Sequence, residues 1–347
     1  MVRPDGPIPA SIMIVGEAPG ADEEIKGIPF VGTSGQELNR MLHEAGLTRA
    51  ECFVTNVCRV RPPNNDISSF IAKTKKEITP KHIKIFDKHV LPPIVEGLEL
   101  LKKEIALVQP KVILALGNTP LWALTTRWGI TKWRGSLLST APDYGPAVTV
   151  IPSYHPAAIL RQWDWRAIGV RDFRRVRDIR DLGPPEAPRW NFRIGPSYDQ
   201  AIYELDSLRE RLDSGSIRRI SFDIETRAGH IACAGLSWSP VDAICIPFMS
   251  FERRSGYWTL DEESNIVWRV YLILTHKNVE VVGQNILYDA QYTYRYWHFV
   301  PRVVQDTMIA QHAVFSALPK GLDFLASMYC RYYVWWKGEG KEFYGNL

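Results

Sequence analysis

The clearest candidates for chemistry in the second half of the sequence are the two acids of Asp223-Ile224-Glu225. They close an apolar segment, Ile217–Ile224, which is typical of a β-strand. Because side chains alternate along a strand, both carboxylates lie on the same face. Two neighbouring carboxylates in an apolar strand are costly unless a cation compensates their charge. The pattern therefore predicts a cation site at the end of this strand.

A second candidate site begins at Gly16-Glu17-Ala18-Pro19-Gly20, directly after an apolar segment. Glycine and proline there predict a tight turn whose backbone amides can donate to a ligand. Alone, this turn is more typical of an ordinary strand-to-helix loop. Four further segments strengthen the case for a ligand site. They are Gly27–Gly32, Thr55–Val57 leading to Arg61-Pro62-Pro63, Leu116–Asn118 and Ser153–Ala157.

These residues need a scaffold, and the first half of the chain predicts one in which strands and helices alternate. The expected strands are Ser11–Val15, Cys52–Val57, Lys111–Leu116 and Ala147–Ile151, and the expected helices are Ser34–Ala45, Val95–Val108 and Arg166–Arg180. Such alternation predicts an α/β fold with a parallel sheet covered on both sides. Ligands of such folds bind at the carboxyl ends of the strands.

The second half predicts strands first and then mostly helices, which fits an α/β domain with a mixed sheet. The expected strands are Ile217–Ile224, Ala232–Ser237 and Ala243–Phe248, and the expected helices are Asp199–Leu212, Glu263–Thr275, Asp289–Trp297 and Asp306–Phe315. Between the halves, residues 183–196 contain four prolines and two glycines, so we expect an extended linker. The alternative is a surface strap packed on one domain. The expected domains are thus residues 1–182 and 197–347.

The composition fits a globular protein of two domains. Of the 347 residues, 46% are hydrophobic and 23% are charged, which argues against a disordered or fibrous chain. No segment approaches the roughly 20 apolar residues that span a bilayer, so we expect no membrane association and a cytoplasmic location. The five cysteines form no Cys-x-x-Cys pair, which predicts reduced thiols. A net charge of +4 is compatible with nucleic acid but is weak support for it.

Together, the segments of the first half resemble family 4 uracil-DNA glycosylases over roughly residues 10–180, most closely at Phe30–Gln36 followed by Asn39-Arg40. A glycosylase holds a base that has been extracted from the stack. The resemblance implies that Phe30 stacks on uracil and that Asn56 reads its N3/O4 edge. It further implies that His155 donates to O2, with help from main-chain amides around Gly16 and Glu17.

The same resemblance assigns further roles and exposes two departures. Glu23 would crowd the C5 position of the base, and Arg161 would hold the DNA backbone. Ala18 stands where better-known branches have an aspartate, so Glu17 or Asn56 would position the water. The site is therefore expected to be slow, or to bind without cutting.

Family members usually carry four cysteines that ligate an iron–sulfur cluster, and the second departure concerns these ligands. Val60 stands at the place of the third ligand, and Cys58 is displaced by two residues. We therefore expect no iron–sulfur cluster. A lysine-rich insertion from about Asn64 to Pro92 replaces the cluster, contacts phosphates, or is a solvated charged face.

The second half resembles the 3′–5′ proofreading exonuclease domain of bacterial DNA polymerase I and its phage relatives, from about residue 197 onward. This implies a ribonuclease H-like fold in which Asp223, Glu225 and Asp289 ligate two ions, Mg²⁺ or Mn²⁺. Asn285 would help to hold the site and its DNA, and Asp306-Thr307 would be structural. The family's last motif, Tyr-x-x-x-Asp, is missing, since Tyr329 and Tyr344 have no aspartate four residues later. We therefore expect weak or absent exonuclease activity from this chain.

Certain bacteriophage family A DNA polymerases resemble the whole layout, with a glycosylase-like module ahead of the exonuclease. We therefore expect the N-terminal region of a phage replicative polymerase in an infected bacterial cell, with Cys330–Leu347 part of an unfinished domain. Its partners would be single-stranded template, DNA 3′ ends and a polymerase domain in cis or in trans. One alternative is a non-catalytic module that binds DNA or a partner through a degenerate pocket. Another is a free-standing repair nuclease.

Overall fold

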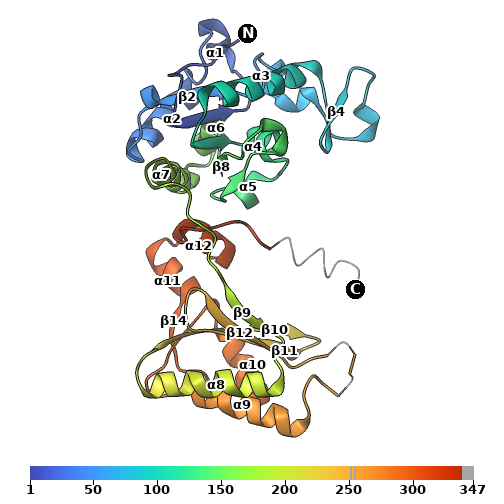
Figure 1. Cartoon of the computed structure of the whole chain (residues 1–347). Coiled ribbons are helices and arrows are strands. Elements are labelled where there is room, and N and C mark those ends of the chain that lie inside the picture. The colour runs from blue at the N-terminus through green and yellow to red at the C-terminus, as the bar shows by residue number, and fades with distance from the viewer. Residues whose placement is uncertain (251, 254, 338–347) are drawn as a thin grey trace. The chain divides into compact units, whose positions relative to one another are not determined.

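The computed structural model describes residues 1–250, 252–253 and 255–337. The described residues form two compact units, one of Met1–Glu186 together with residues 323–337, and one of Ala187–Leu322 (Figure 1). Each is an α/β unit with its own sheet, as the sequence predicts. No helix within these described ranges is both long and apolar enough to cross a membrane.

The first unit is built on a five-stranded sheet in the order β2-β1-β6-β8-β7. Its strands are β1 (Ile12–Gly16), β2 (Cys52–Asn56), β6 (Val112–Leu116), β7 (Leu138–Ser139) and β8 (Thr149–Ser153). Strands β1, β2, β6 and β8 are parallel, and β7 runs antiparallel to β8. Every residue of β1, β2 and β6 is buried, as expected for a parallel sheet covered on both faces.

Helices cover both faces of this sheet (Figure 1). They are α1 (Ala21–Lys26), α2 (Thr33–Glu44), α3 (Pro92–Val108), α4 (Asn118–Thr125), α5 (Ile130–Trp133), α6 (Pro156–Arg161) and α7 (Arg166–Leu182). On one face, Leu101 of α3 and Trp122 of α4 share a core with Met13 of β1. On the other, α7 packs against β6 and β8. The three helices and four strands predicted for this half are confirmed to within a few residues.

The lysine-rich insertion folds as a small antiparallel sheet in the order β3-β5-β4, which the sequence interpretation did not foresee. Its strands are β3 (Ile71–Ala72), β4 (Ile83–Ile85) and β5 (Lys88–Val90). Strands of two or three residues are too short to show an alternating pattern. Ile67, Ile71 and Val90 bury their side chains in the core of the first unit.

The second unit has a six-stranded mixed sheet in the order β14-β13-β10-β11-β12-β9. The strands are β9 (Asn191–Ile194), β10 (Arg219–Arg227), β11 (His230–Ser237), β12 (Asp242–Pro247), β13 (Glu280–Gly283) and β14 (Val303–Asp306). The hairpins β10-β11 and β11-β12 are antiparallel, whereas β13 and β14 run parallel to β10. This order around a central β10 is the ribonuclease H-like arrangement, as predicted.

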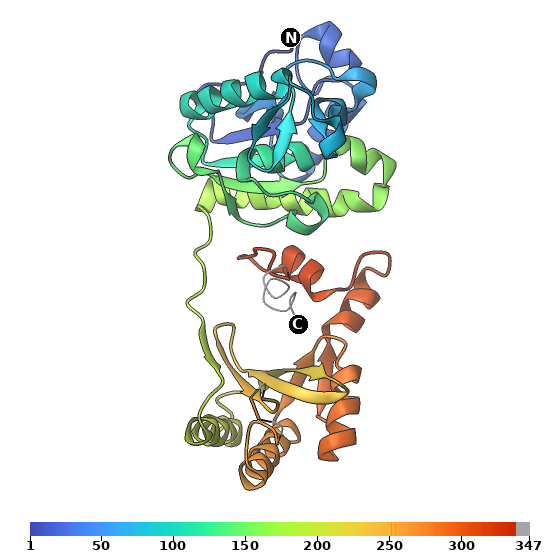
Figure 2. The ribbon, with the colours of Figure 1, turned by 90° about the vertical axis from the view of Figure 1, so that its right-hand side faces the viewer.

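Four helices of the second unit accompany this sheet: α8 (Tyr198–Asp213), α9 (Leu260–Leu274), α10 (Leu287–Trp297) and α11 (Thr307–Val314) (Figure 2). Ile220, Phe222 and Ile224 of β10 are buried in their core. Asp223 and Glu225 lie on the opposite, exposed face, which confirms the predicted alternation. The sequence interpretation missed β13 and β14, since strands of four residues between helices give a weak pattern.

The predicted linker needs a correction, because its second half is the edge strand β9, paired in parallel with β12. Asn191–Ile194 is free of proline, so its amides can donate to a neighbouring strand. Residues 184–190, which contain three of the prolines, form neither helix nor strand. Strand β9 therefore corresponds to the alternative interpretation, in which the segment packs on one domain as a surface strap.

The predicted second domain also ends too late. Residues 323–337 pack with the first unit, including all but the first residue of α12 (Leu322–Tyr329). The physical reason is a set of arginine side chains in the first unit that bind the carbonyls of this segment. The described part of Cys330–Leu347 therefore does not belong to an unfinished second domain, and residues 338–347, including Tyr344, lie outside the described residues.

Candidate functional site

Three of the predicted base-binding residues meet at the carboxyl edge of the first sheet. Gly16 ends β1 and is in register with Asn56, which ends β2. A β-carbon on Gly16 would overlap the Oδ1 atom of Asn56 and would lie 2.5 Å from Cζ of Phe30. The absence of a side chain at Gly16 therefore leaves room for the amide of Asn56 and the ring of Phe30. A larger residue at this position would push both side chains away.

Phe30 is held in an unusual backbone conformation. Its φ is 53°, a region that residues other than glycine rarely adopt, and only 5% of the residue is exposed. The guanidinium of Arg49 donates to the carbonyls of Pro29 and Phe30, at 2.7 and 3.2 Å. Gly35, in the first turn of α2, leaves room for the Phe30 carbonyl. Arg49 was not singled out from the sequence, because no local pattern marks it as a partner of Pro29 and Phe30, which lie 20 and 19 positions earlier.

His155 completes this group and is positioned by α6. Its ring stacks near that of Phe30, with 5.5 Å between the centroids and 28° between the planes. His155 is also the N-cap of α6, where its Nδ1 accepts from the amide of Ala157 at 3.1 Å. Since Nδ1 is an acceptor, the proton of the neutral ring lies on Nε2, which is then a donor. Burial, followed by the charge of Arg161, lowers the pKa of His155 to about 4, so the ring is a neutral donor at physiological pH.

Glu23 braces the loop that carries Phe30. The residue is buried, and one carboxylate oxygen accepts from the amides of Val31 and Gly32, at 3.1 and 3.0 Å. The other accepts from Gly20 at 3.0 Å. These three bonds fix the turn in front of α1 and the turn in front of α2 to each other. The contact of Glu23 with C5 of a base stays a prediction.

Glu17 lies beside this group and is oriented from two directions. The hydroxyl of Thr119 donates to its carboxylate at 2.6 Å, and the amide of Cys58 donates to its carbonyl at 2.9 Å. Burial raises the pKa of Glu17, and the bond from Thr119 opposes that rise. Thr119 is a residue that sequence reasoning missed, although it follows the Leu116–Asn118 segment. Asn118 itself is structural, since its side chain accepts from the amides of Gly129 and Ile130.

The cysteines of the first unit do not fit an iron–sulfur cluster. Cys58 is buried in an apolar cluster with Ile67 and Val90, and its thiol donates to the carbonyl of Val60. Burial raises the pKa of this thiol, whereas a cluster ligand is a thiolate. Cys52 is buried separately, with its thiol donating to Thr48. Residues of the insertion thus fill the space around Cys58 with apolar side chains.

The second unit brings its three predicted carboxylates together around one backbone amide. Asp223 and Glu225 flank Ile224, whose amide donates to Oδ1 of Asp289 at 2.8 Å. This amide is available because the ladder between β10 and β13 stops at Ser221. Burial, together with the charges of Asp223 and Glu225, raises the pKa of Asp289 to about 6. Burial and Glu225 likewise raise the pKa of Asp223.

Carboxylate oxygens are the donors that Mg²⁺ and Mn²⁺ prefer, so the chemistry of this cluster suits such ions. Within the described ranges, however, no three His, Cys, Asp or Glu side chains are arranged closely enough to form a ready cation site. A shallow hollow on the same face is lined by Asp223, Phe192, Ile194 and Cys245, among other residues. The cluster is therefore a set of neighbouring acids beside an apolar hollow.

The turn after β13 is held by Asp306 rather than by Asn285. The carboxylate of Asp306 accepts from the amides of Asn285 and Ile286, at 3.1 and 2.9 Å, and caps α11 through Met308. This confirms that Asp306 is structural. Asn285 is exposed and has a φ of 55°. Its predicted part in holding DNA is not tested by these contacts.

Comparison with known proteins identifies the first unit. Residues 3–176 match the family model of the uracil DNA glycosylase superfamily. The chain belongs to this superfamily. A type-4 uracil-DNA glycosylase of Saccharolobus solfataricus is 33% identical over 186 residues, which cover 52% of this chain and 76% of that protein. A second, from Sulfurisphaera tokodaii, is 35% identical over 177 residues, covering 49% of this chain and 70% of that protein.

Two further matches extend beyond the superfamily. A DNA polymerase of Bacillus phage SP01 is 26% identical over 221 residues, which cover 62% of this chain but only 21% of that protein. Escherichia coli RNase D, an exoribonuclease, is 14% identical with a TM-score of 0.30, over 40% of this chain and 33% of the RNase D chain. The chain thus spans about a fifth of the phage polymerase and a third of RNase D.

Proposed function

We propose that the first unit removes uracil, or a related modified pyrimidine, from DNA. Membership of the uracil DNA glycosylase superfamily supports an enzymatic role. The observation that carries the proposal is the convergence of Gly16, Phe30, Asn56 and His155, with the only ring proton of His155 placed on Nε2. An aromatic face, an amide and a neutral donor are the groups that hold and polarise a flipped base.

The proposed reaction is hydrolysis of the glycosidic bond. The bond between C1′ and the base nitrogen breaks, its electron pair stays with the base, and negative charge develops on O2. Nε2 of His155 donates a hydrogen bond to that oxygen, with backbone amides near Gly16 and Glu17 as further donors. A water molecule, positioned by Glu17 or Asn56, adds to C1′ and loses its proton to solvent. Arg161, at the exposed end of α6, would contact the DNA backbone.

A uracil-release assay on single- and double-stranded DNA tests this proposal. Wild type is expected to release uracil, and His155→Ala and Asn56→Ala are each expected to release it about 100- to 1,000-fold more slowly, because a pre-placed hydrogen-bond group is lost. His43→Ala, on the exposed side of α2, is the matched control and should leave the rate unchanged. Release by wild type at background level would refute glycosylase activity and favour a module that binds without cutting.

We propose further that the second unit is a metal-dependent 3′–5′ exonuclease domain of a phage-type DNA polymerase. The ribonuclease H-like strand order and the grouping of three carboxylates support it, as does the match to the phage polymerase. Asp223, Glu225 and Asp289 would hold Mg²⁺ or Mn²⁺, which supplies an activated water and stabilises the leaving 3′ oxygen when bound. DNA 3′ ends would be the substrate and the polymerase domain the partner, in cis or in trans.

Trimming of a 5′-labelled single strand tests this second activity. We expect slow, Mn²⁺-dependent shortening from the 3′ end by the wild-type chain, lost in Asp223→Asn. Trimming that persists in this variant, or that survives excess chelator, would contradict the proposal.

A further inference from the structure

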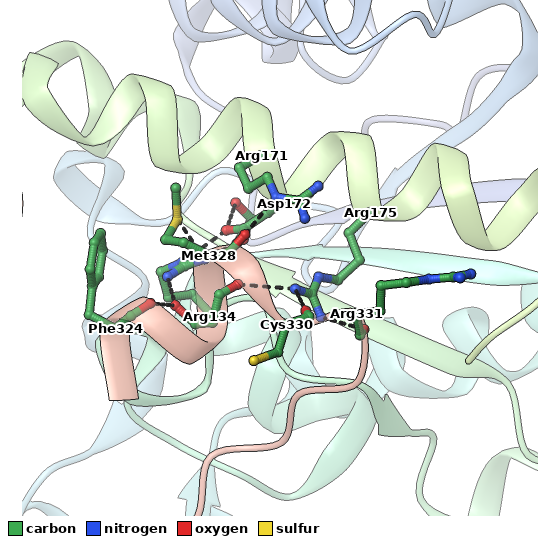
Figure 3. A network of polar contacts seen from close by, with 10 residues as sticks. Arg134, Arg171, Asp172, Arg175, Phe324, Met328, Cys330 and Arg331 are labelled. Atoms are coloured by element: carbon green, nitrogen blue, oxygen red, sulfur yellow. Dashed lines mark hydrogen bonds and ion pairs between the residues drawn. The ribbon is translucent and has the colours of Figure 1, made fainter. Parts of the chain in front are cut away.

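The segment from Asp323 to Trp336 is bound to the first unit by an arginine cluster (Figure 3). The guanidinium of Arg175 donates to the carbonyls of Ser327, Cys330 and Arg331, at 3.0, 2.8 and 3.2 Å. Arg171 donates to the carbonyl of Met328 at 2.8 Å. Ser327 and Met328 lie in the last turn of α12, where the helix dipole is negative, so the two cations bind the helix end that favours them. Cys330 and Arg331 follow directly after the helix.

A second set of contacts extends the attachment beyond the helix. The amide of Leu137 donates to the carbonyl of Tyr333 at 2.8 Å, and the amide of Trp335 donates to the hydroxyl of Ser136 at 3.2 Å. The ring of Trp335 packs edge-on against Trp133, with 5.3 Å between the centroids. We call residues 323–336 the docked segment.

A buried ion pair connects the docked segment to β8, the strand that ends two residues before His155. Arg134 and Asp172 are 3% and 0% exposed, and two nitrogens of Arg134 donate to the Asp172 carboxylate at 2.5 and 3.1 Å. A third nitrogen of Arg134 donates to the hydroxyl of Ser327 at 2.6 Å. On its other side, Asp172 accepts from the hydroxyl of Ser153 at 2.9 Å. Ser153 ends β8, two residues before His155.

These bonds form one continuous path from Ser327 through Arg134 and Asp172 to Ser153. Breaking a buried pair by removing one of its partners is costly, because the remaining charge is left uncompensated. If the docked segment left, Arg134 would lose its Ser327 partner and Arg175 would lose three carbonyls. Both guanidinium groups would then have to find new partners or water, and Asp172 would move with Arg134.

We infer that Asp172 is a positioning residue for His155 and that the docked segment acts as a latch, which holds the base pocket in its competent geometry by locking Arg134 against Asp172. This inference rests on the proposed glycosylase function of the first unit. In this proposal the docked segment acts indirectly. Its effect is to fix the end of β8, from which the chain passes through Tyr154 to His155 and α6.

The test loosens the latch without removing a charge. In the full chain, Arg175→Lys keeps the cation, but a single ammonium cannot reproduce the fork that reaches three carbonyls. Arg174→Lys, the exposed neighbour on α7, is the matched control. A milder variant, Ser327→Ala, removes only the hydroxyl that Arg134 contacts. Its control is Ser264→Ala, because the Ser264 hydroxyl bonds only its own helix at the carbonyl of Leu260.

Two readouts follow the latch and the pocket separately. Amide exchange in α12 reports docking, and exchange at Ala157 reports whether the His155 ring still accepts from that amide. Single-turnover uracil release gives the rate of the chemical step apart from KM. We expect Arg175→Lys to speed exchange at both places by about tenfold. The same variant should slow the chemical step by about tenfold and leave KM nearly unchanged, since the lost geometry acts in the transition state.

The outcomes separate the latch from simpler explanations. Faster exchange in α12 with unchanged Ala157 exchange and an unchanged rate would overturn the inference and make the docked segment structural only. If wild type releases no uracil, the glycosylase proposal fails, and Ala157 exchange alone then decides whether docking holds His155. If Arg175→Lys does not fold, the same comparison is made with Ser327→Ala, for which a smaller change in the same direction is expected.

Discussion

The two candidate sites of this chain differ in the charge of the side chains that form them. The base pocket of the first unit is built from neutral groups: a phenyl ring, an amide, and an imidazole whose pKa is lowered to about 4. The carboxylate cluster of the second unit gathers three acids, and mutual repulsion together with burial raises the pKa of Asp289 to about 6. The first group consists of uncharged side chains, whereas in the second burial and neighbouring carboxylates oppose ionisation.

The difference also appears in how each site is held. Phe30, Asn56 and His155 are fixed by bonds to backbone groups or by close packing, so their positions do not depend on a bound ligand. In the cluster, only the Asp289 carboxylate is fixed to the backbone, through the amide of Ile224. Neutral donors can be preorganised by the fold alone, but like charges need a ligand to bring them together.

The largest effect that follows from this comparison is expected from adding one methyl group at Gly16. Gly16→Ala would push the Asn56 amide and the Phe30 ring apart, and a displacement of about 1 Å in a reacting geometry costs about 100-fold in rate. Single-turnover uracil release measures the loss. Gly235→Ala, on β11, is the matched control, because its β-carbon would lie 3.7 Å from the Asp223 carbonyl and meet no strain. A rate within threefold of wild type would show that the space at Gly16 is not needed to position Asn56 and Phe30.

The neutral state of His155 predicts a specific dependence of stability on pH. Its folded pKa of about 4 lies below the usual 6.5, so the unfolded chain takes up the proton first as the pH falls. The free energy of unfolding should therefore drop between pH 6.5 and 4, by up to about 3 kcal/mol from this residue. Denaturant unfolding at several pH values measures it against His155→Asn, which keeps an acceptor for Ala157 but does not titrate. Equal pH dependence of the two proteins would contradict a neutral His155.

The raised pKa of Asp289 predicts how stability should respond to its mutation and to added metal. Because the folded pKa of Asp289 is raised, its ionisation opposes folding as the pH rises through about 4 to 6. In chelator, Asp289→Asn should therefore raise the melting temperature at neutral pH. Added Mn²⁺ should stabilise wild type, by about 2.7 kcal/mol at 100 times its Kd, and should stabilise the variant much less.

Asp164→Asn, an exposed acid of the first unit, is the control for this comparison. Equal stabilisation of wild type and Asp289→Asn by Mn²⁺ would place the ion elsewhere.

The smallest effect is expected in the lysine-rich insertion, whose Lys75 and Lys76 are exposed. If they contact phosphates, Lys75→Ala with Lys76→Ala should lower the slope of log Kd against log salt by about 1 for each lysine. Fluorescence anisotropy with a labelled single strand measures this slope, and Lys103→Ala on α3 is the control. An unchanged slope would leave the insertion with only its packing role around Cys58.

Features that depend on local pattern could be predicted from the sequence alone. Alternation fixed Asp223 and Glu225 on one face of β10, and the apolar runs fixed β1, β2 and β6 as buried strands. The glycine of the first turn and the His155-Pro156 start of α6 also follow from local rules for strand and helix ends. Chemistry at the ends of strands can therefore be predicted from spacing.

The distant residues that hold those ends in place emerged only from the fold. Thr119 reaches Glu17 across 102 positions, and Ser327 reaches Arg134 across 193. The fold also shows that Asn191–Ile194 is a strand and that residues 323–337 pack with the first unit. The reason is that a hydrogen bond or ion pair between distant residues leaves no periodic trace in the chain, since its energy depends on where the fold places both partners.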